Sequence, residues 1–120
     1  MPSSKALALA GLLASVTPAL ADGSGRAPQR VVSINLCTDQ LAMLLAAPGQ
    51  LVSVSHLAQE VQSSSMVAEA MAYPVNRGQV EQVFLLNPDL VLADTYTQVS
   101  TVQLLRDLGV TVVQVPPETS

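Results

Sequence analysis

Residues 85–94 constrain the fold of this chain more than any other segment. Two leucines close an apolar-periodic stretch, and the Asn-Pro-Asp sequence at 87–89 breaks it, because proline cannot continue a helix and disfavours the α region for the residue before it. Residues 90–93 then form an apolar run of strand length, which is typical of a parallel sheet covered on both faces. Ligands bind such sheets at the loops that follow the carboxyl ends of the strands. The segment therefore predicts an α/β fold and a candidate site that begins at Asp94.

The rest of the chain alternates between strand-like and helix-like segments. Expected strands cover residues 30–34, 51–55, 90–93 and 110–115, and expected helices cover residues 39–47, 66–72, 79–86 and 101–108. Short connections between such segments imply right-handed crossovers, so we expect a doubly wound, mostly parallel sheet. Residues 51–55 alternate apolar and polar side chains, which predicts an edge strand with one wet face.

The expected helix ends follow capping preferences. Thr38 is expected as the N-cap of the first helix, with Asp39 favourably placed at the positive helix end. Gly109 is expected as the C′ residue of the last helix. Apolar spacing predicts two sets of inward-facing side chains: Val80, Val83 and Phe84, and Val102, Leu105 and Leu108.

Residues 1–21 have the layout of a secretory signal peptide. Lys5 precedes an apolar core at residues 6–16, and the small-residue sequence Ala-Leu-Ala follows at 19–21. The core is shorter than the about 20 apolar residues that span a bilayer. We therefore expect cleavage after residue 21 and export to the periplasm; a buried amino-terminal helix is the alternative. Residues 22–29, with two glycines and a proline, predict a flexible leader.

Composition excludes several classes of function. Cys37 is the single cysteine, so the chain has no internal disulfide and no Cys-based zinc site. The net charge is −4, the arginines are scattered, and aromatic residues make up 2% of the chain. Without a basic patch or stacking platforms, nucleic acid is not an expected partner.

The chain also lacks the usual signatures of a small enzyme. No Gly-x-Gly-x-x-Gly follows the first predicted strand, and no phosphate-binding Gly-x-x-x-x-Gly-Lys occurs anywhere. His56 is the only histidine, and no recognised catalytic motif pairs it with a serine or cysteine nucleophile. A small Rossmann-like enzyme is therefore a weaker alternative to a binding module.

Four segments carry a recognisable pattern: Arg-Val-Val-Ser-Ile-Asn at 30–35, Thr-Asp-Gln-Leu-Ala at 38–42, Asn-Pro-Asp-Leu-Val-Leu-Ala at 87–93 and Leu-Arg-Asp-Leu-Gly-Val at 105–110. Taken in order and with their spacing, they resemble the N-terminal lobe of the ABC-transporter solute-binding proteins for cobalamin, ferric siderophores and haem. The match extends from about Arg30 to Val115. Gln40 stands where members of the family often carry glutamate, so any role of that carboxylate is lost.

The resemblance implies a binding protein and not an enzyme. In that family, two α/β lobes joined by one long helix hold the ligand in the cleft between them. Residues 30–120 correspond to one lobe, so the chain resembles a fragment or a truncated reading frame. The implied partners are an iron chelate or a corrinoid and a membrane permease, and we expect a monomer with no cofactor and no metal site of its own. An inert remnant of a split gene is the alternative.

The candidate ligand contacts follow three of the predicted strands. They are Asn35, Leu36, Cys37 and Thr38 after the first strand, Ser55 and His56 after the second, and Asp94, Thr95 and Tyr96 after the third. The first group lies at a helix N-terminus that could meet an anionic group such as a carboxylate, although plain helix capping explains it equally well. We expect Cys37 to be a buried, inert thiol, although a helix N-terminus can lower a thiol pKa.

His56 and Tyr96 are the most distinctive of these residues. His56 offers a ligand for iron or a hydrogen-bond donor to a chelate; we expect contact without ligation, and an ordinary loop histidine is the alternative. The ring of Tyr96 suits contact with a flat macrocycle or a catecholate; a solvated surface tyrosine is the alternative interpretation. Tyr73 is the second aromatic candidate for ligand contact, because the sequence equally predicts that it ends a helix and packs on the core.

Glu81 is the expected contact with a permease. It falls in the first turn of the helix expected at residues 79–86, where a carboxylate also favours the helix dipole. In the family that the chain resembles, a carboxylate at this position, ahead of the Asn-Pro-Asp sequence, docks an arginine of the membrane permease. We expect docking because an exposed charge attracts a partner without being buried.

Overall fold

The computed structural model describes residues 26–116. The expected signal peptide at residues 1–21 therefore lies outside the described residues, as does the first half of the leader, residues 22–25. The elements are β1 (Val31–Ser33), α2 (Leu36–Leu45), β2 (Leu51–Ser55), the 3₁₀ helix η2 (His56–Gln59), α3 (Val67–Ala70), β3 (Val75–Asn76), α4 (Val80–Leu85), β4 (Leu90–Asp94), α5 (Val99–Asp107) and β5 (Val112–Val115). Within the described residues, none of the helices has the length and hydropathy to cross a membrane.

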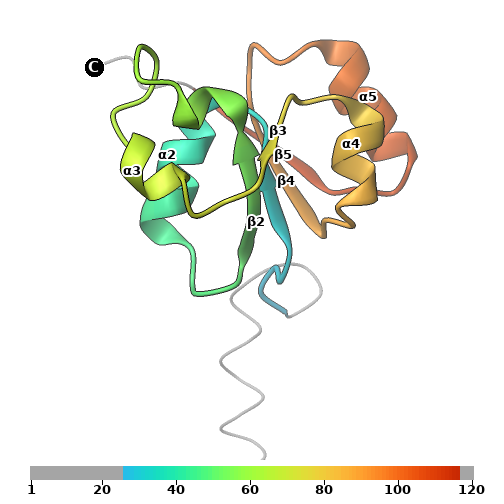
Figure 1. Ribbon diagram of the computed structural model, residues 1–120. Coiled ribbons are helices and arrows are strands. Elements are labelled where there is room, and N and C mark those ends of the chain that lie inside the picture. Colours follow the sequence, from blue (N-terminus) through green and yellow to red (C-terminus); the bar gives the residue numbers. More distant parts are fainter. Residues whose placement is uncertain (1–25, 117–120) are drawn as a thin grey trace, which may run out of the picture.

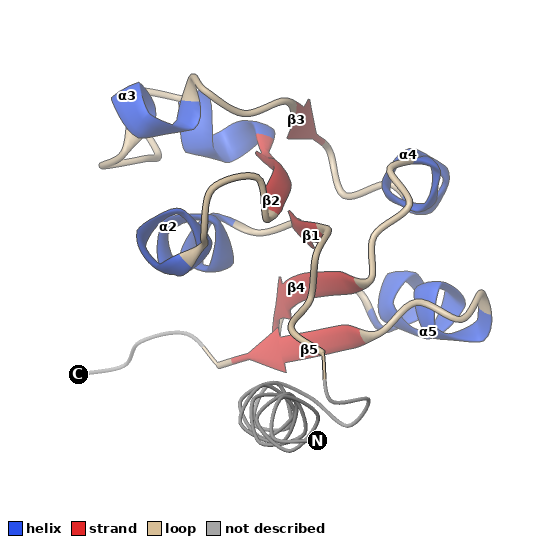
Figure 2. Ribbon diagram, turned by 90° about the horizontal axis from the view of Figure 1, so that it is seen from below, coloured by secondary structure: helices blue, strands red, loops and turns tan. Residues whose placement is uncertain are grey.

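The strands form one five-stranded parallel sheet in the order β3-β2-β1-β4-β5. Helices α2 and α3 cover one face, and α4 and α5 cover the other (Figures 1 and 2). This arrangement confirms the predicted doubly wound α/β fold. The chain runs outward from β1 to β2 and β3, then returns to place β4 on the other side of β1. The strand order therefore reverses between β1 and β4, which is where ligands bind in open sheets of this kind.

Strand β4 confirms the prediction of a strand with apolar contacts on both sides. Val91 and Ala93 are fully buried in the core beneath α4 and α5. Leu90 and Leu92 pack, partly buried, against the second core, on the α2 side of the sheet. Each face of the strand thus contributes to a different hydrophobic cluster, and both clusters depend on it.

The prediction that residues 51–55 form an edge strand with a wet face is wrong. Strand β2 lies between β1 and β3, and β3 is a two-residue strand that follows Pro74 and was not predicted. The polar side chains of β2 are buried and hydrogen-bonded. The Ser53 hydroxyl donates to the Pro74 carbonyl at 3.0 Å, and the buried amide of Asn76 donates to the Ser53 hydroxyl at 3.0 Å. The alternation therefore marks an internal polar network and not a solvated face.

The break at residues 87–89 joins two strand starts that are distant in sequence. Asn87 lies outside the right-handed α region, as predicted, but takes a left-handed conformation with φ 55°, which asparagine tolerates better than most residues, and not the extended conformation usual before proline. The Asp89 carboxylate accepts hydrogen bonds from the backbone N–H groups of Gln29 at 2.7 Å and Arg30 at 2.9 Å. The Arg30 guanidinium in turn donates to the carbonyls of Leu86 and Asn87. These contacts fix the amino ends of β1 and β4 next to each other.

The last helix ends as predicted. Gly109 has φ 90°, its N–H donates to the Arg106 carbonyl, and the Val110 N–H donates to the Leu105 carbonyl. This pair of bonds is the Schellman motif, which favours glycine.

Two of the residues expected to face inward are instead exposed. Leu108 is 46% exposed and Phe84 is 44% exposed, because α5 ends before Leu108 and α4 presents Val83 to the sheet.

Candidate functional site

The predicted contact residues gather along one edge of the sheet. Strands β1, β2 and β4 are parallel, so the loops that follow them emerge at the same carboxyl edge (Figure 1). We call this the carboxyl edge; its predicted contacts are Asn35, Leu36, Cys37, Thr38, Ser55, His56, Asp94, Thr95 and Tyr96. The structure brings the three loops together, but it does not expose all of these side chains.

Thr38 is not the helix cap. Helix α2 begins at Leu36 with Asn35 as its N-cap, three residues earlier than predicted. Thr38 is therefore inside the first turn and buried, where its hydroxyl donates to the Asn35 carbonyl at 3.0 Å and shares a 2.7 Å hydrogen bond with the Ser33 hydroxyl. Its side chain holds the strand–helix junction together and presents nothing to a ligand.

Asn35 ties the loop after β1 to the loop after β4. Its Oδ1 atom accepts hydrogen bonds from the backbone N–H of Asp94 at 2.8 Å and from the hydroxyl of Thr97 at 2.7 Å. The Asp94 carboxylate accepts the N–H of Tyr96 at 2.9 Å. The turn at 94–97 is thus fixed across the point where the strand order reverses. Thr97 was not predicted as a site residue. Its partner Asn35 lies 62 positions away in the sequence, and its other partner, Asp94, is in the same short turn.

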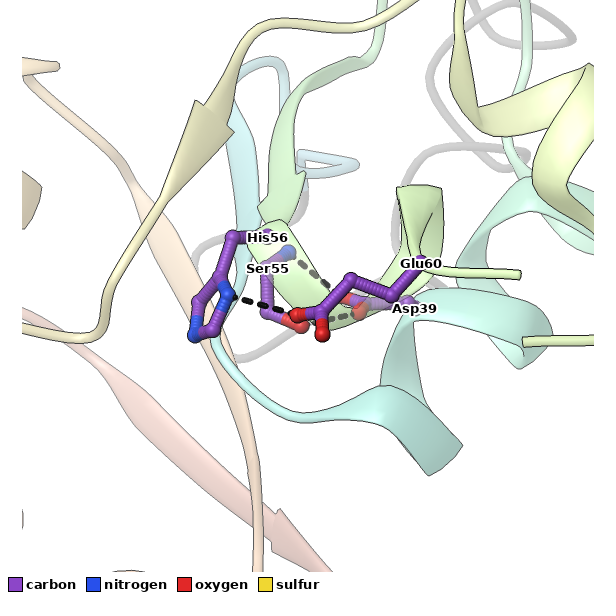
Figure 3. A network of polar contacts seen from close by, with 4 residues as sticks. All are labelled: Asp39, Ser55, His56 and Glu60. Carbon is purple, nitrogen blue, oxygen red and sulfur yellow. Dashed lines mark hydrogen bonds and ion pairs between the residues drawn. The ribbon is translucent and has the colours of Figure 1, made fainter. Parts of the chain in front are cut away.

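A second polar network ties the end of β2 to α2 (Figure 3). The fully buried carboxylate of Asp39 accepts the N–H of Ser55 at 2.9 Å and the Ser55 hydroxyl. The next residue, His56, contacts the carboxylate of Glu60 through Nδ1 at 3.0 Å. Ser55 is buried and positions the loop, whereas His56 is partly exposed at the carboxyl edge. Asp39 was expected only to favour the helix dipole, and Glu60 was not predicted.

Burial raises the pKa of the Asp39 carboxyl above its ordinary value of 3.8, because removal from water disfavours the charged form. The hydrogen bonds from Ser55 and the nearby His56 ring act in the opposite direction and only partly offset this effect. Asp39 is thus a buried acid whose role is to hold the β2 loop in place.

The prediction that Cys37 is buried is wrong. Its thiol is free and exposed, because the earlier start of α2 turns Thr38 inward and Cys37 outward. Tyr96 is 82% exposed, next to the exposed Thr95, whereas Tyr73 packs on the core on the α2 side, as its alternative interpretation expected.

A hollow of about 380 Å³ lies where the strand order reverses, and we call it the switch-point pocket. It is lined by Ile34, Asn35, Arg77, Gly78, Gln79, Thr97, Gln98 and Thr101. These residues come from the ends of β1, β3 and β4 and from the starts of α4 and α5. Within residues 26–116 there is no group of three or more His, Cys, Asp or Glu side chains that could hold a metal ion.

Comparison with known proteins finds similarity in structure only. No family model matches the chain, and no curated protein sequence matches it. A periplasmic heme-binding protein from Pseudomonas aeruginosa is similar with a TM-score of 0.57 and 23% identity, over 74% of this chain and 32% of that protein. A possible iron-binding, periplasmic solute-binding protein from Staphylococcus epidermidis gives 0.58 and 21%, over 78% and 36%. The periplasmic vitamin B12-binding protein BtuF of Vibrio cholerae gives 0.56 and 24%, over 72% and 34%.

The chain spans about a third of the length of these three structures. At these identities the similarity concerns the fold. It confirms the expected α/β fold and, at the level of the fold, the resemblance to heme- and B12-binding proteins.

The raised pKa of Asp39 predicts how stability depends on pH. The folded protein binds this proton more readily than the unfolded chain, so the stabilising contribution is complete below about pH 4 and is lost as the pH rises through the raised pKa. The free energy of unfolding of the wild type relative to Asp39→Asn should therefore fall as the pH rises, by about 1.4 kcal/mol per pH unit in that interval. Urea unfolding between pH 4 and 7 measures this difference. Asp107→Asn, at an exposed carboxylate on α5, is the control. A difference that grows with pH would contradict the prediction.

Proposed function

We propose that this chain is the N-terminal lobe of the substrate-binding component of an ABC importer. It binds an iron chelate, either a siderophore or haem, or cobalamin, and docks on a permease in the inner membrane. The lobe performs no reaction; it presents its carboxyl edge as one wall of a ligand cleft. One observation supports this proposal above the others: the loops after β1, β2 and β4 meet at one edge, and hydrogen bonds fix each of them.

The contact residues differ in the role that we propose for each. Leu36, Cys37, His56, Thr95 and Tyr96 have exposed or partly exposed side chains and form the contact surface. Asn35, Ser55 and Asp94 use side-chain atoms in hydrogen bonds within the lobe, so they position the surface. This division follows the usual design of binding sites, in which a rigid scaffold supports a few adaptable contacts.

Two alternatives are weaker. A small Rossmann-like enzyme would need a phosphate-binding glycine motif or a nucleophile with a base. The sequence has no such glycine motif, and the hydroxyl of Ser55, the serine next to the only histidine, donates to the Asp39 carboxylate. An inert remnant of a split gene has no reason to keep an ordered carboxyl edge, whereas here three loops are held by specific buried or partly buried hydrogen bonds.

Ligand titration tests the proposal directly. A cleft binder gains affinity by burying most of its ligand between two walls, and these residues supply one wall. We expect a chain of these residues alone to bind hemin, cyanocobalamin or a ferric siderophore with a Kd above roughly 10 μM. Calorimetry measures the affinity, and amide NMR shifts upon addition of diamagnetic cyanocobalamin or a gallium-substituted siderophore locate the site. Submicromolar binding would contradict the need for a second wall, and shifts away from the carboxyl edge would contradict the site.

Glu81 supports the docking part of the proposal. It is exposed in the first turn of α4, two residues after Gln79, which lines the switch-point pocket. Among the residues that the structure describes, its carboxylate has no hydrogen-bond or ion-pair partner. The charge is therefore available to a cation on a membrane partner.

Removal of this charge should weaken docking and leave ligand affinity unchanged. In a protein that carries both lobes, we expect Glu81→Ala to weaken association with the permease about fivefold at low salt, because an exposed ion pair contributes up to about 1 kcal/mol. The effect should shrink as ionic strength rises. Glu69→Ala, at an exposed carboxylate on α3 across the sheet, is the matched control. Equal association of wild type and Glu81→Ala at low salt would leave Glu81 as a helix-end residue only.

Export is the remaining part of the proposal. We expect the mature chain to begin at Asp22, because the small-residue sequence before it suits signal-peptide cleavage. Mass spectrometry of the exported product reads this residue directly. Retention of Met1 or Pro2 would exclude the cleavage.

A further inference from the structure

An apolar groove lies on the α2 side of the sheet, and we call it the α2 groove. It encloses about 340 Å³, and its lining includes Leu41, Leu45, Leu90 and Leu92 together with Pro28 and Gln50. Gln50 is the only polar residue among the described residues that line it, and none of them is charged. The groove therefore suits an apolar occupant and offers no partner to an ionic one.

The described helices do not cover all of the sheet on this side. Figure 2 shows α2 next to β1 and β2, whereas no described helix lies over the same face of β5. Val112 belongs to the core beneath α4 and α5, so the next residue, Val113, faces the α2 side, and it is 45% exposed. Leu45, in the lining of the groove, is 74% exposed. Because parallel sheets are normally covered on both faces, this face retains apolar surface that another segment can bury.

The chain enters the described fold at the α2 groove. Pro28 is part of the lining, and its carbonyl accepts a hydrogen bond from the Gln50 side-chain amide at 2.9 Å. The Val31 N–H donates to the Gln50 carbonyl at 2.9 Å, so the entering strand is held to the same residue twice. Residues 1–25 precede the described part of the chain, and only Arg26 and Ala27 separate them from the groove.

Residues 6–16 have the composition to fill this groove. They carry no charge and include leucines at positions 7, 9, 12 and 13 among alanine, glycine, serine and valine. Residues 17–27 connect them to Pro28, and such a tether reaches up to roughly 40 Å when extended. Helix α2, with ten residues, is only about 15 Å long. Glycines at positions 23 and 25 permit the chain to reverse its direction toward the groove.

We propose that residues 6–16 bind in the α2 groove for as long as they remain attached to the folded chain. The inference is independent of ligand binding and concerns the uncleaved chain. Attachment favours this occupant over a second copy, because a short tether gives an effective concentration in the millimolar range, whereas two copies lose translational freedom when they associate. Burial of leucine side chains against an uncharged groove supplies the free energy. Cleavage after residue 21 releases the segment and uncovers the groove.

Limited proteolysis of the uncleaved full chain tests the inference. Elastase accepts small side chains, so it cuts residues 6–16 when they are accessible. We expect Leu45→Glu, which places a charge in the groove, to speed cleavage within residues 6–16 about tenfold, because the buried contact of one leucine is lost. Leu41→Glu should act in the same direction. Leu44→Glu is the matched control, since Leu44 is exposed on the same helix and does not line the groove.

Mass spectrometry locates the cuts, and urea unfolding checks that each variant keeps its fold. Faster cleavage in the two groove variants but not in Leu44→Glu, at rates independent of protein concentration, supports the inference. Equal rates in the wild type and all three variants would overturn it. Protection that increases with protein concentration would also overturn it, because the groove would then be covered by a second copy. None of these outcomes depends on whether hemin, cyanocobalamin or a siderophore binds, so the proposed function is tested separately.

Discussion

The rest of the sheet depends on the hydrogen bonds that the side chains of Arg30 and Asp89 make with backbone groups at the starts of β1 and β4. The Asp89 carboxylate accepts hydrogen bonds from the backbone N–H groups just before β1, and the Arg30 guanidinium donates to the carbonyls at the end of α4. The two strands then run in register, with Val31 opposite Leu90. The switch-point pocket lies at the opposite edge of the same two strands, where the strand order reverses.

At the carboxyl edge, side chains from α2 and from its N-cap hold the loops in place by hydrogen bonds to their backbone. Asn35 reaches toward β4 and Asp39 reaches toward β2, so the start of one helix organises the loops on both sides of β1. The acid at Asp39 is buried without a cation in contact, which is costly unless its oxygens are hydrogen-bonded, and Ser55 meets that need. A rigid junction of this kind allows the exposed residues around it to vary without loss of geometry.

Sequence patterns predicted the parts of the molecule that local chemistry determines. The Asn-Pro-Asp break, the strand at β4 and the glycine at the end of α5 follow from backbone preferences that act within a few residues. Strand β3 could not be predicted in this way, because two residues carry no periodicity and Asn76 makes its hydrogen bonds with β1 and β2. Alternation in β2 was misleading for a related reason: a pattern shows polar positions, but not whether water or another side chain satisfies them. The exposure of Cys37 was missed because the helix begins three residues earlier than predicted, which places Cys37 in its first turn on the solvent side.

The distance along the chain between the partners of β1 sets the order in which the sheet can be completed. Strand β2 follows β1 within about twenty residues, but Asp89 and its backbone partner Gln29 are 60 positions apart. Closure of so long a loop is entropically costly, so the contact between β1 and β4 belongs among the late events of folding. The switch-point pocket, whose walls come from both sides of that contact, is thus formed only when the lobe is nearly complete, and a partly folded chain would offer a ligand no specific place to bind.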